Sequence, residues 1–206
     1  MNDTYEISSV SKLRDLLGEP SELASQKVFD YVDQYAAEFI AKAPLAVLAT
    51  SDSEGRLDLS PKGDAPGFVL VEDQNTLLLP DRPGNRLAYG FENILQTGRA
   101  ALIFMVPGVR ETLRVNGRAT LSYAPDLLER LSARGKPAVL CTRIAVEESF
   151  FHCGKAMIRS RLWQPDSWPE NARANLGKQL SAKLAGSDEL TDHIDAALED
   201  SYVNEL

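Results

Sequence analysis

The stretch GRAALIFMVPGVRETLRVNGRATLSY, residues 98–123, decides the fold of this chain. Its first arm, residues 100–105, is a continuous apolar run that stops at Val106-Pro107-Gly108, which is typical of a strand buried on both faces. In the second arm polar and apolar side chains alternate, which predicts another strand and hence a hairpin. One face of that strand would carry Leu113, Val115, Gly117 and Ala119, and the other Thr112, Arg114, Asn116 and Arg118.

The polar face of this second arm has two interpretations. Polar side chains on a strand usually face solvent, so a solvated outer sheet surface is the simpler one. The same side chains are hydrogen-bond donors, and the face could instead contact a polar ligand. The alternation by itself leaves both interpretations open.

Length and composition are those of a soluble globular domain. With 206 residues, 44% of them hydrophobic and 25% charged, the chain can bury a substantial core, and we expect one domain over residues 1–206. No basic segment precedes an apolar one at the start, and no apolar run approaches the roughly 20 residues of a membrane span, so we expect a cytoplasmic protein. Cys141 and Cys153 indicate neither a disulfide framework nor a zinc site, and each should be a buried or reactive free thiol.

The net charge of −8 is distributed unevenly along the chain. Residues 1–40 hold eight acidic and three basic side chains, and residues 187–206 hold seven acidic and none basic. The interior, residues 41–186, has nineteen basic against fifteen acidic side chains, a surplus of four. General nucleic-acid binding requires an exposed basic face and is not expected, whereas a small anionic ligand is compatible with the positive interior.

The periodicity changes from helix to strand at residue 45. Before it we expect a helix at 11–18 and a longer one from Ser21 to just before Pro44, which together form a layer packed on a sheet. After it we expect strands at 45–52, 56–64, 67–71, 76–79, 100–105, 112–119 and 138–146. Further helices are expected within 81–98, entered from the turn Pro83-Gly84-Asn85, and at 125–132, 155–163, 171–184 and 189–200. Residues 147–154 lead into the helix at 155–163.

Short strands at close spacing, interrupted by a single helix, favour a mostly antiparallel barrel over a doubly wound parallel sheet. The predicted fold is therefore mostly β with flanking helices. Residues 44–165 would form the barrel, residues 1–43 an N-terminal helical segment, and residues 166–206 an acidic helical extension.

Common catalytic motifs are absent from the sequence. It contains no G-x-G-x-x-G, no G-x-x-x-x-G-K-[ST], no H-E-x-x-H and no G-x-S-x-G. With only His152 and His193, a metal site of several histidines is hard to build, and we expect none. His152 follows two phenylalanines and is better explained as a partly buried polar residue than as a catalytic base.

Basic and hydroxyl side chains recur at predicted strand ends and turns. A phosphate group needs convergent N–H and O–H donors and compensating charge, and a helix N-terminus supplies backbone donors. The turn before the helix within 81–98 has this form, although arginine on a surface turn is usually just solvated. The residues concerned are Ser60 and Lys62 at the end of the second strand, Arg82, Asn85 and Arg86 around the turn, and Lys155, Arg159 and Ser160 near one helix.

Lys155 and Arg159 stand four residues apart on a predicted helix, where like charges repel by a few tenths of a kcal/mol. An amphipathic helix with a basic rim is one explanation. The other is that an anion or a partner subunit offsets the repulsion.

Four ordered motifs make residues 38–165 resemble a known family: LAVLATSDSEGRLDLSPKGDAPGFV, LLLPDRPGNRLAYGFENILQTGRAALIFMVPG, TLRVNGRA and FHCGKAMIRSRLW. They resemble the flavin-nucleotide-binding relatives of pyridoxamine 5'-phosphate oxidase. The resemblance implies an FMN-binding split β-barrel of the antiparallel Greek-key type, an obligate homodimer, and FMN in clefts at the subunit interface. It implies Ser60, Lys62, Arg82, Asn85 and Arg86 near the FMN phosphate and ribityl chain, Thr112 and Arg114 near the ring system, and Lys155, Arg159 and Ser160 from the second subunit.

Three functions follow as hypotheses. The first is an FMN-dependent oxidoreductase with a small-molecule substrate, in which the flavin does the redox chemistry and no side chain need be an acid or base. The second is a non-catalytic module that stores or senses flavin, and the third is a structural dimer with an empty site. The substrate-binding residues of the vitamin B6 enzyme have no counterpart here, FMN and a related deazaflavin are both open, and Cys153 is either a redox thiol or simply packed.

Overall fold

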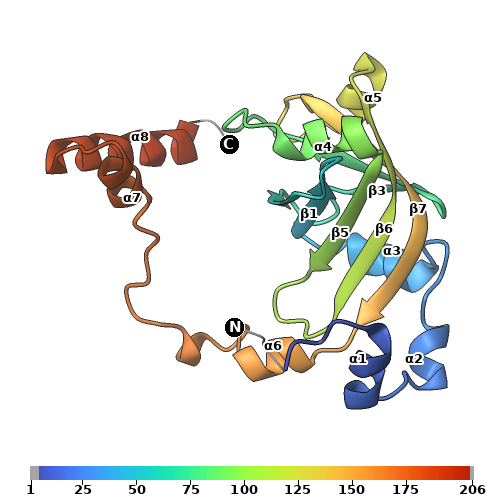
Figure 1. Cartoon of the computed structure of the whole chain (residues 1–206). Coiled ribbons are helices and arrows are strands. Elements are labelled where there is room, and N and C mark those ends of the chain that lie inside the picture. Colours follow the sequence, from blue (N-terminus) through green and yellow to red (C-terminus); the bar gives the residue numbers. More distant parts are fainter. Residues whose placement is uncertain (1–4, 205–206) are drawn as a thin grey trace.

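The computed structural model describes residues 5–204, which form a seven-stranded sheet with flanking helices (Figure 1). The strands are β1 (Leu45–Ser51), β2 (Leu57–Gly63), β3 (Leu70–Asp73), β4 (Thr76–Asp81), β5 (Arg99–Met105), β6 (Thr112–Ser122) and β7 (Leu140–His152). The helices are α1 (Val10–Leu17), α2 (Glu22–Gln26), α3 (Gln34–Ile40), α4 (Tyr89–Thr97), α5 (Pro125–Arg130), α6 (Lys155–Ser160), the 3-10 helix η1 (Pro165–Ser167), α7 (Leu176–Lys183) and α8 (Asp188–Asn204).

All strand pairs are antiparallel, and the strand order is β2-β1-β5-β6-β7-β4-β3. The two arms of the stretch at 98–123 are β5 and β6, which pair with each other and lie inside the sheet. Within residues 5–204 the sheet does not close on itself, because β2 and β3 remain edge strands. This is the split form of an antiparallel barrel, so the predicted fold is confirmed.

The main core lies on one face of the sheet, and the strands supply it by simple alternation, while a smaller cluster around Leu78 and Cys141 packs with residues of α5. In β6, Leu113 and Val115 are fully buried and Ala119 almost so, as the sequence pattern predicted. Phe104 of β5 and Leu48 of β1 are buried in the same cluster. Helix α3 covers this cluster with Ala36 and Ile40, which are themselves buried.

Gly117 marks an irregularity in the centre of the sheet. The register between β6 and β7 shifts at Asn116/Gly117, where one strand gains a residue relative to the other. A Cβ atom at Gly117 would clash with the backbone carbonyl of Ala145 on β7. The close approach of the two backbones therefore requires glycine at this position.

We expect Gly117→Ala to destabilise the protein by about 1–3 kcal/mol, because the added methyl group must push two central strands apart. The measurement is the free energy of unfolding from urea titration followed by circular dichroism. Gly84→Ala is the matched control, since a Cβ there would meet no atom of the described chain within 4 Å. Equal stability of the two variants would contradict the tight approach of β6 and β7.

The N-terminal region differs from its prediction. The single helix expected between Ser21 and Pro44 is split into α2 and α3, because Phe29 pairs with Ser149 of β7 through two backbone hydrogen bonds of 2.8 and 3.0 Å. The side chain of Asp33 then starts α3 by accepting the N–H of Ala36 at 2.7 Å. Helices α1 and α2 have no buried residue, so the predicted packed layer consists of α3 alone.

The ends of several other helices and strands also differ from the prediction. The third strand was expected at 67–71 but begins at Leu70, because Gly67 adopts a left-handed backbone conformation with φ of 82°. Strand β7 was expected to end at residue 146 but continues to His152, since the irregularity at Gly117 lets it stay paired with β6. The helix expected at 155–163 stops at Ser160, because Arg161 is left-handed. The helix expected at 171–184 begins only at Leu176.

The C-terminal helices stand apart from the sheet. Helix α7 packs against α8, and Figure 1 shows this hairpin joined to α6 by a long connection, with only the C-terminal end of α8 near the barrel. Among the described residues no helix is long and apolar enough to cross a membrane.

Candidate functional site

A hollow of about 1150 Å³ opens between β2, the end of β4 and the start of α4. We call it the β2–α4 hollow. Strand β2 turns Asp58, Ser60 and Lys62 to one side by alternation, and these positions are the less exposed ones of the strand. Five of the residues expected near a phosphate line this one hollow: Ser60, Lys62, Arg82, Asn85 and Arg86.

Arg82 is held by an acidic partner but keeps a free donor. Its Nε donates to Asp64 Oδ2 at 2.8 Å, and Asp64 also pairs with Arg134 at 3.4 Å. Burial alone would raise the pKa of Asp64, but hydrogen bonds from Ala65 N–H and Arg82, with the charges of Arg82 and Arg134, lower the pKa below its usual value. Arg82 Nη1 is buried and has no hydrogen-bond partner in the described chain, which is costly unless a ligand accepts from it.

Arg86 sits in an unusual loop that leads into α4. Both Arg86 and Ala88 adopt the left-handed backbone conformation, with φ of 60° and 57°, which costs a non-glycine residue roughly 1–2 kcal/mol. Asn85 supports the loop by accepting the N–H of Leu87 at 3.1 Å. Such strain tends to occur at functional sites. No acidic partner of Arg86 occurs among residues 5–204, so its charge is available to a ligand.

Helix α4 begins at the wall of the hollow without a capping side chain. Its cap residue Ala88 offers no side-chain acceptor, and Tyr89 and Gly90 of the first turn line the hollow. The N–H groups of a first helical turn and the helix dipole favour an anion at this position. The turn Pro83-Gly84-Asn85 does introduce this helix, which begins at Tyr89.

The charges lining the hollow sum to a positive value. Four cationic side chains line it against two acidic ones, Asp58 and Asp81. Lys62 is neutralised by Asp81 at 2.8 Å and lies 5.0 Å from the centre of the Phe91 ring. Lys136 was missed by the sequence reasoning, because nothing in the sequence relates the loop before β7 to the turn at residue 83. The hollow thus combines positive charge, hydroxyl and amide donors, and an aromatic wall.

Two further predicted site residues lie outside this hollow. Thr112 and Arg114 are on β6, where Thr112 is paired with His152 and Arg114 with Phe150. The Arg114 guanidinium lies 5.0 Å from the Phe150 ring centre, and its Nε is buried without a partner in the described chain. Burial, followed by the charges of Arg114 and Lys27, lowers the pKa of His152, so this imidazole is neutral at physiological pH.

The last three predicted residues are on α6. Lys155, Arg159 and Ser160 are exposed, and Ser160 Oγ donates to Met157 O at 3.2 Å. In the described chain neither Lys155 nor Arg159 has an acidic partner. Helix α6 lies at the opposite end of the sheet from α4 in Figure 1, so a single chain does not bring these residues to the hollow.

The sheet face opposite the core is largely uncovered, and we call it the open face. It consists of neighbouring rows across β2, β1, β5, β6 and β7, fixed by the strand registers. Leu57 and Leu59 of β2 are 82% and 70% exposed on it. One row consists of Leu59, Ala49, Ala101, Asn116 and Glu148, taken from β2 to β7. The other row, in the same strand order, consists of Pro61, Val47, Ile103, Arg114 and Phe150.

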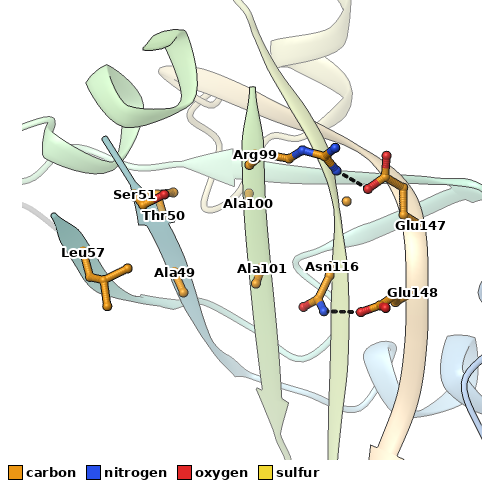
Figure 2. A pocket seen from close by; sticks show the side chains of 11 residues that line it. Ala49, Thr50, Ser51, Leu57, Arg99, Ala100, Ala101, Asn116, Glu147 and Glu148 are labelled. Carbon is orange, nitrogen blue, oxygen red and sulfur yellow. Dashed lines mark hydrogen bonds and ion pairs between the residues drawn. The ribbon is translucent and has the colours of Figure 1, made fainter. Parts of the chain in front are cut away.

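A second, smaller hollow of about 590 Å³ lies on the open face (Figure 2). Small side chains form its floor, including Ala49 and Ala101. Figure 2 shows the ion pair of Arg99 with Glu147 and the 2.6 Å hydrogen bond from Asn116 to Glu148 on one side of it. Arg99, Glu147, Glu148 and the Asn116 amide nitrogen are thus paired, whereas Asn116 Oδ1 is buried without a hydrogen-bond partner in the described chain.

The two cysteines have different environments. Cys141 is buried with Leu78 and Leu131, and burial raises the pKa of its thiol to about 11, so the thiol stays protonated and unreactive. Cys153 is exposed beside α6 and is not among the residues that line the β2–α4 hollow.

The fold defines a split-barrel protein, and the hollow at the start of α4 carries surplus positive charge. A family model for pyridoxamine 5'-phosphate oxidase matches residues 32–153, more than half of the chain. The chain therefore belongs to the pyridoxamine 5'-phosphate oxidase family, and the recognised resemblance is confirmed. No curated protein matches the sequence.

Several solved structures are similar to part of this chain. They include HupZ from Group A Streptococcus (20% identity, 58% of this chain and 93% of that one, TM-score 0.47) and the heme storage protein HutZ from Vibrio cholerae (12%, 59% and 94%, 0.43). The General Stress Protein 26 from Bacillus anthracis str. Sterne is another (11%, 57% and 94%, 0.42). At these identities and TM-scores the similarity says nothing about the ligand of this chain.

Proposed function

We propose that this chain binds FMN as a homodimer and is an FMN-dependent oxidoreductase that acts on a small molecule. The observation that carries the proposal is the unpartnered, buried Nη1 of Arg82 in a hollow with surplus positive charge and an uncapped helix start. A phosphate dianion would accept a hydrogen bond from Arg82 Nη1, offset the surplus positive charge, and accept from the free N–H groups at the start of α4. Membership of the family supports a flavin as the bearer of that phosphate.

The residues present fit this cofactor. Arg82 and Arg86 would hold the phosphate by charged hydrogen bonds, with the α4 backbone N–H groups beside them. Ser60 and Asn85 offer donors for the ribityl chain, and Lys62 is fixed next to Phe91 by its ion pair with Asp81. The flavin, when bound, supplies the redox chemistry, and the chain supplies binding, orientation and a positive environment.

A second subunit would complete the site. The open face combines exposed Leu57 and Leu59 with the small side chains of Ala49 and Ala101, which lets another sheet approach closely. Exposed apolar surface of this kind is typical of protein–protein contacts. We infer that two chains associate through their open faces, with Thr112 and Arg114 in the interface and α6 of one subunit next to the hollow of the other.

The absorption spectrum of the purified protein tests the cofactor. We expect a yellow protein that releases FMN on denaturation, identified by chromatography against a deazaflavin and heme. A colourless protein that also fails to bind added FMN would contradict the proposal.

A second experiment tests the enzymatic activity. Reduced nicotinamide cofactor, added in the absence of oxygen, should bleach the absorption of the bound flavin. A flavin that no tested electron donor bleaches would favour a storage or sensing module.

A further inference from the structure

The C-terminal arm, residues 161–204, meets its own barrel near its two ends, where the Trp163 indole donates to Val109 O and Asn204 lines the β2–α4 hollow. Helices α7 and α8 fit closely, because Gly177 leaves room for the Asp195 carboxylate and Ser181 Oγ donates to Ser187 O at 3.0 Å. Neither helix packs extensively against another described element. A helix of eight residues such as α7 is marginal in water without tertiary packing, and in the described chain that packing comes mainly from α8.

An apolar stripe on α7 shows where that contact would form. Leu176, Leu180 and Leu184 follow one another at four-residue spacing and therefore lie along one edge of the helix. They are 41%, 42% and 63% exposed, and the residues that α7 buries are Gly177 and Ser181. The connection to α6 adds Trp168, which is exposed while its indole N–H donates to Leu162 O at 2.8 Å.

The connection between α6 and α7 has the length to pass another subunit. It is fixed at its start, where the Trp163 indole donates to Val109 O at 2.9 Å. Residues 164–175 then run on with only the short helix η1, and at about 3.3 Å per residue they can span roughly 40 Å. A barrel of about 120 residues has a diameter of roughly 35 Å. The arm can thus cross the width of a second barrel.

Charge indicates which kind of surface receives the hairpin. Helix α8 carries six acidic side chains and neither lysine nor arginine. The interior of the sequence has a surplus of four positive charges, and Lys155, Arg159, Arg86 and Lys136 lack acidic partners within residues 5–204. Helix α8 reaches its own barrel only at its last turn, where Asn204 lies at the rim of the β2–α4 hollow. The acidic side chains of α8 form no ion pair with the barrel within residues 5–204, so they are available to a basic surface of another molecule.

We propose that the C-terminal arm of each chain packs on a second copy of this chain, so that two subunits exchange their α7–α8 hairpins across the dimer. The occupant of the apolar stripe is the partner barrel, which has the complementary positive charge and lies within reach of the connection. This inference rests on the proposed homodimer and extends it, because it adds a contact outside the open face.

Sedimentation equilibrium of charge-matched variants tests the exchange. Leu180→Asp places a charge on the apolar stripe and should raise the dimer dissociation constant at least tenfold, whereas Gln179→Asp adds the same charge next to it and should change the constant less than twofold. A chain ending after Gln164 should show the effect of Leu180→Asp, which covers the case that this variant fails to fold. Wild-type dissociation constants for both Leu180→Asp and the shortened chain would overturn the proposal.

Lysine cross-linking distinguishes exchange from docking within one chain. Dimers assembled from nitrogen-15-labelled and unlabelled chains are cross-linked, and peptides containing Lys178 or Lys183 of α7 are analysed by mass spectrometry. We expect their links to barrel lysines to join labelled with unlabelled peptides. The exchange would be overturned if α7 peptides were cross-linked only to barrel peptides with the same isotope label. It would also be overturned if α7 formed no cross-links while the barrel lysines reacted.

Flavin content separates this inference from the proposed function. A yellow wild-type dimer whose association is unaffected both by Leu180→Asp and by removal of the residues after Gln164 would remove the arm exchange alone. A colourless, monomeric wild-type protein that binds no FMN would remove the proposed function as well.

Discussion

Replacing Arg82 or Arg86 by alanine should weaken FMN binding by about 1–3 kcal/mol each, which is roughly 5- to 150-fold in the dissociation constant. Each substitution removes a charged donor from the β2–α4 hollow, where Arg82 Nη1 has no partner in the described chain. Titration of the chromophore-free protein with FMN, followed by flavin fluorescence, measures the loss directly.

The two substitutions should differ in stability. Arg82→Ala also leaves the nearly buried Asp64 with the more distant Arg134 as its remaining cationic partner, so it should lower the free energy of unfolding. Arg86→Ala breaks no ion pair within residues 5–204 and should affect FMN binding alone. Arg14→Ala, on exposed α1, is the control for loss of a surface arginine. Wild-type FMN affinity in both hollow variants would exclude Arg82 and Arg86 from the site.

Substituting Ala101 by arginine should separate the subunits. Ala101 lies in the middle of the open face, directly opposite Ala49 on one side and Asn116 on the other. A long cationic side chain there would prevent close approach and would be buried without a partner. We expect the dimer dissociation constant to rise at least about 100-fold, equivalent to about 2.7 kcal/mol, in sedimentation equilibrium.

Ala24→Arg on the exposed helix α2 is the matched control for Ala101→Arg. It adds the same side chain to a surface that we do not place in the interface, and the dimer should persist. Circular dichroism should show the same secondary structure in both variants. A stable dimer of Ala101→Arg would show that the chains associate through another surface, and the interface proposed for Thr112 and Arg114 would have to be abandoned.

Much of the fold could be predicted because local patterns and tertiary packing agree. The alternation in residues 112–119 indicated the buried face of β6, and Pro107-Gly108 indicated the turn before it. Where packing overrides local preference, the prediction failed. Residues 28–32 have a helical stripe, but the long-range bridge of Phe29 to Ser149 interrupts the helix. The length of β7 depends on the irregularity at Gly117, which no pattern in β7 itself indicates.

The candidate site could be predicted only in part, because local patterns do not show which distant segments of the chain meet in the fold. Ser60, Arg82 and Arg86 sit at strand ends and a turn, where sequence reasoning places ligand-binding groups, and the structure brings them to one hollow. Lys136 joins them through the sheet order, which places β7 next to β4. For Lys155 and Arg159 the sequence pattern predicts the helix but not its position in the fold, since within one chain α6 lies far from the hollow.

The edges of the sheet also restrict how these molecules can associate. Edge strand β2 contains Pro61, which has no N–H to donate, and edge strand β3 has only four residues and includes Glu72 and Asp73. Neither edge is a good template for adding a further strand from another molecule. Growth into fibres by edge-to-edge stacking is thereby discouraged, and a finite, closed assembly is favoured over an open-ended one.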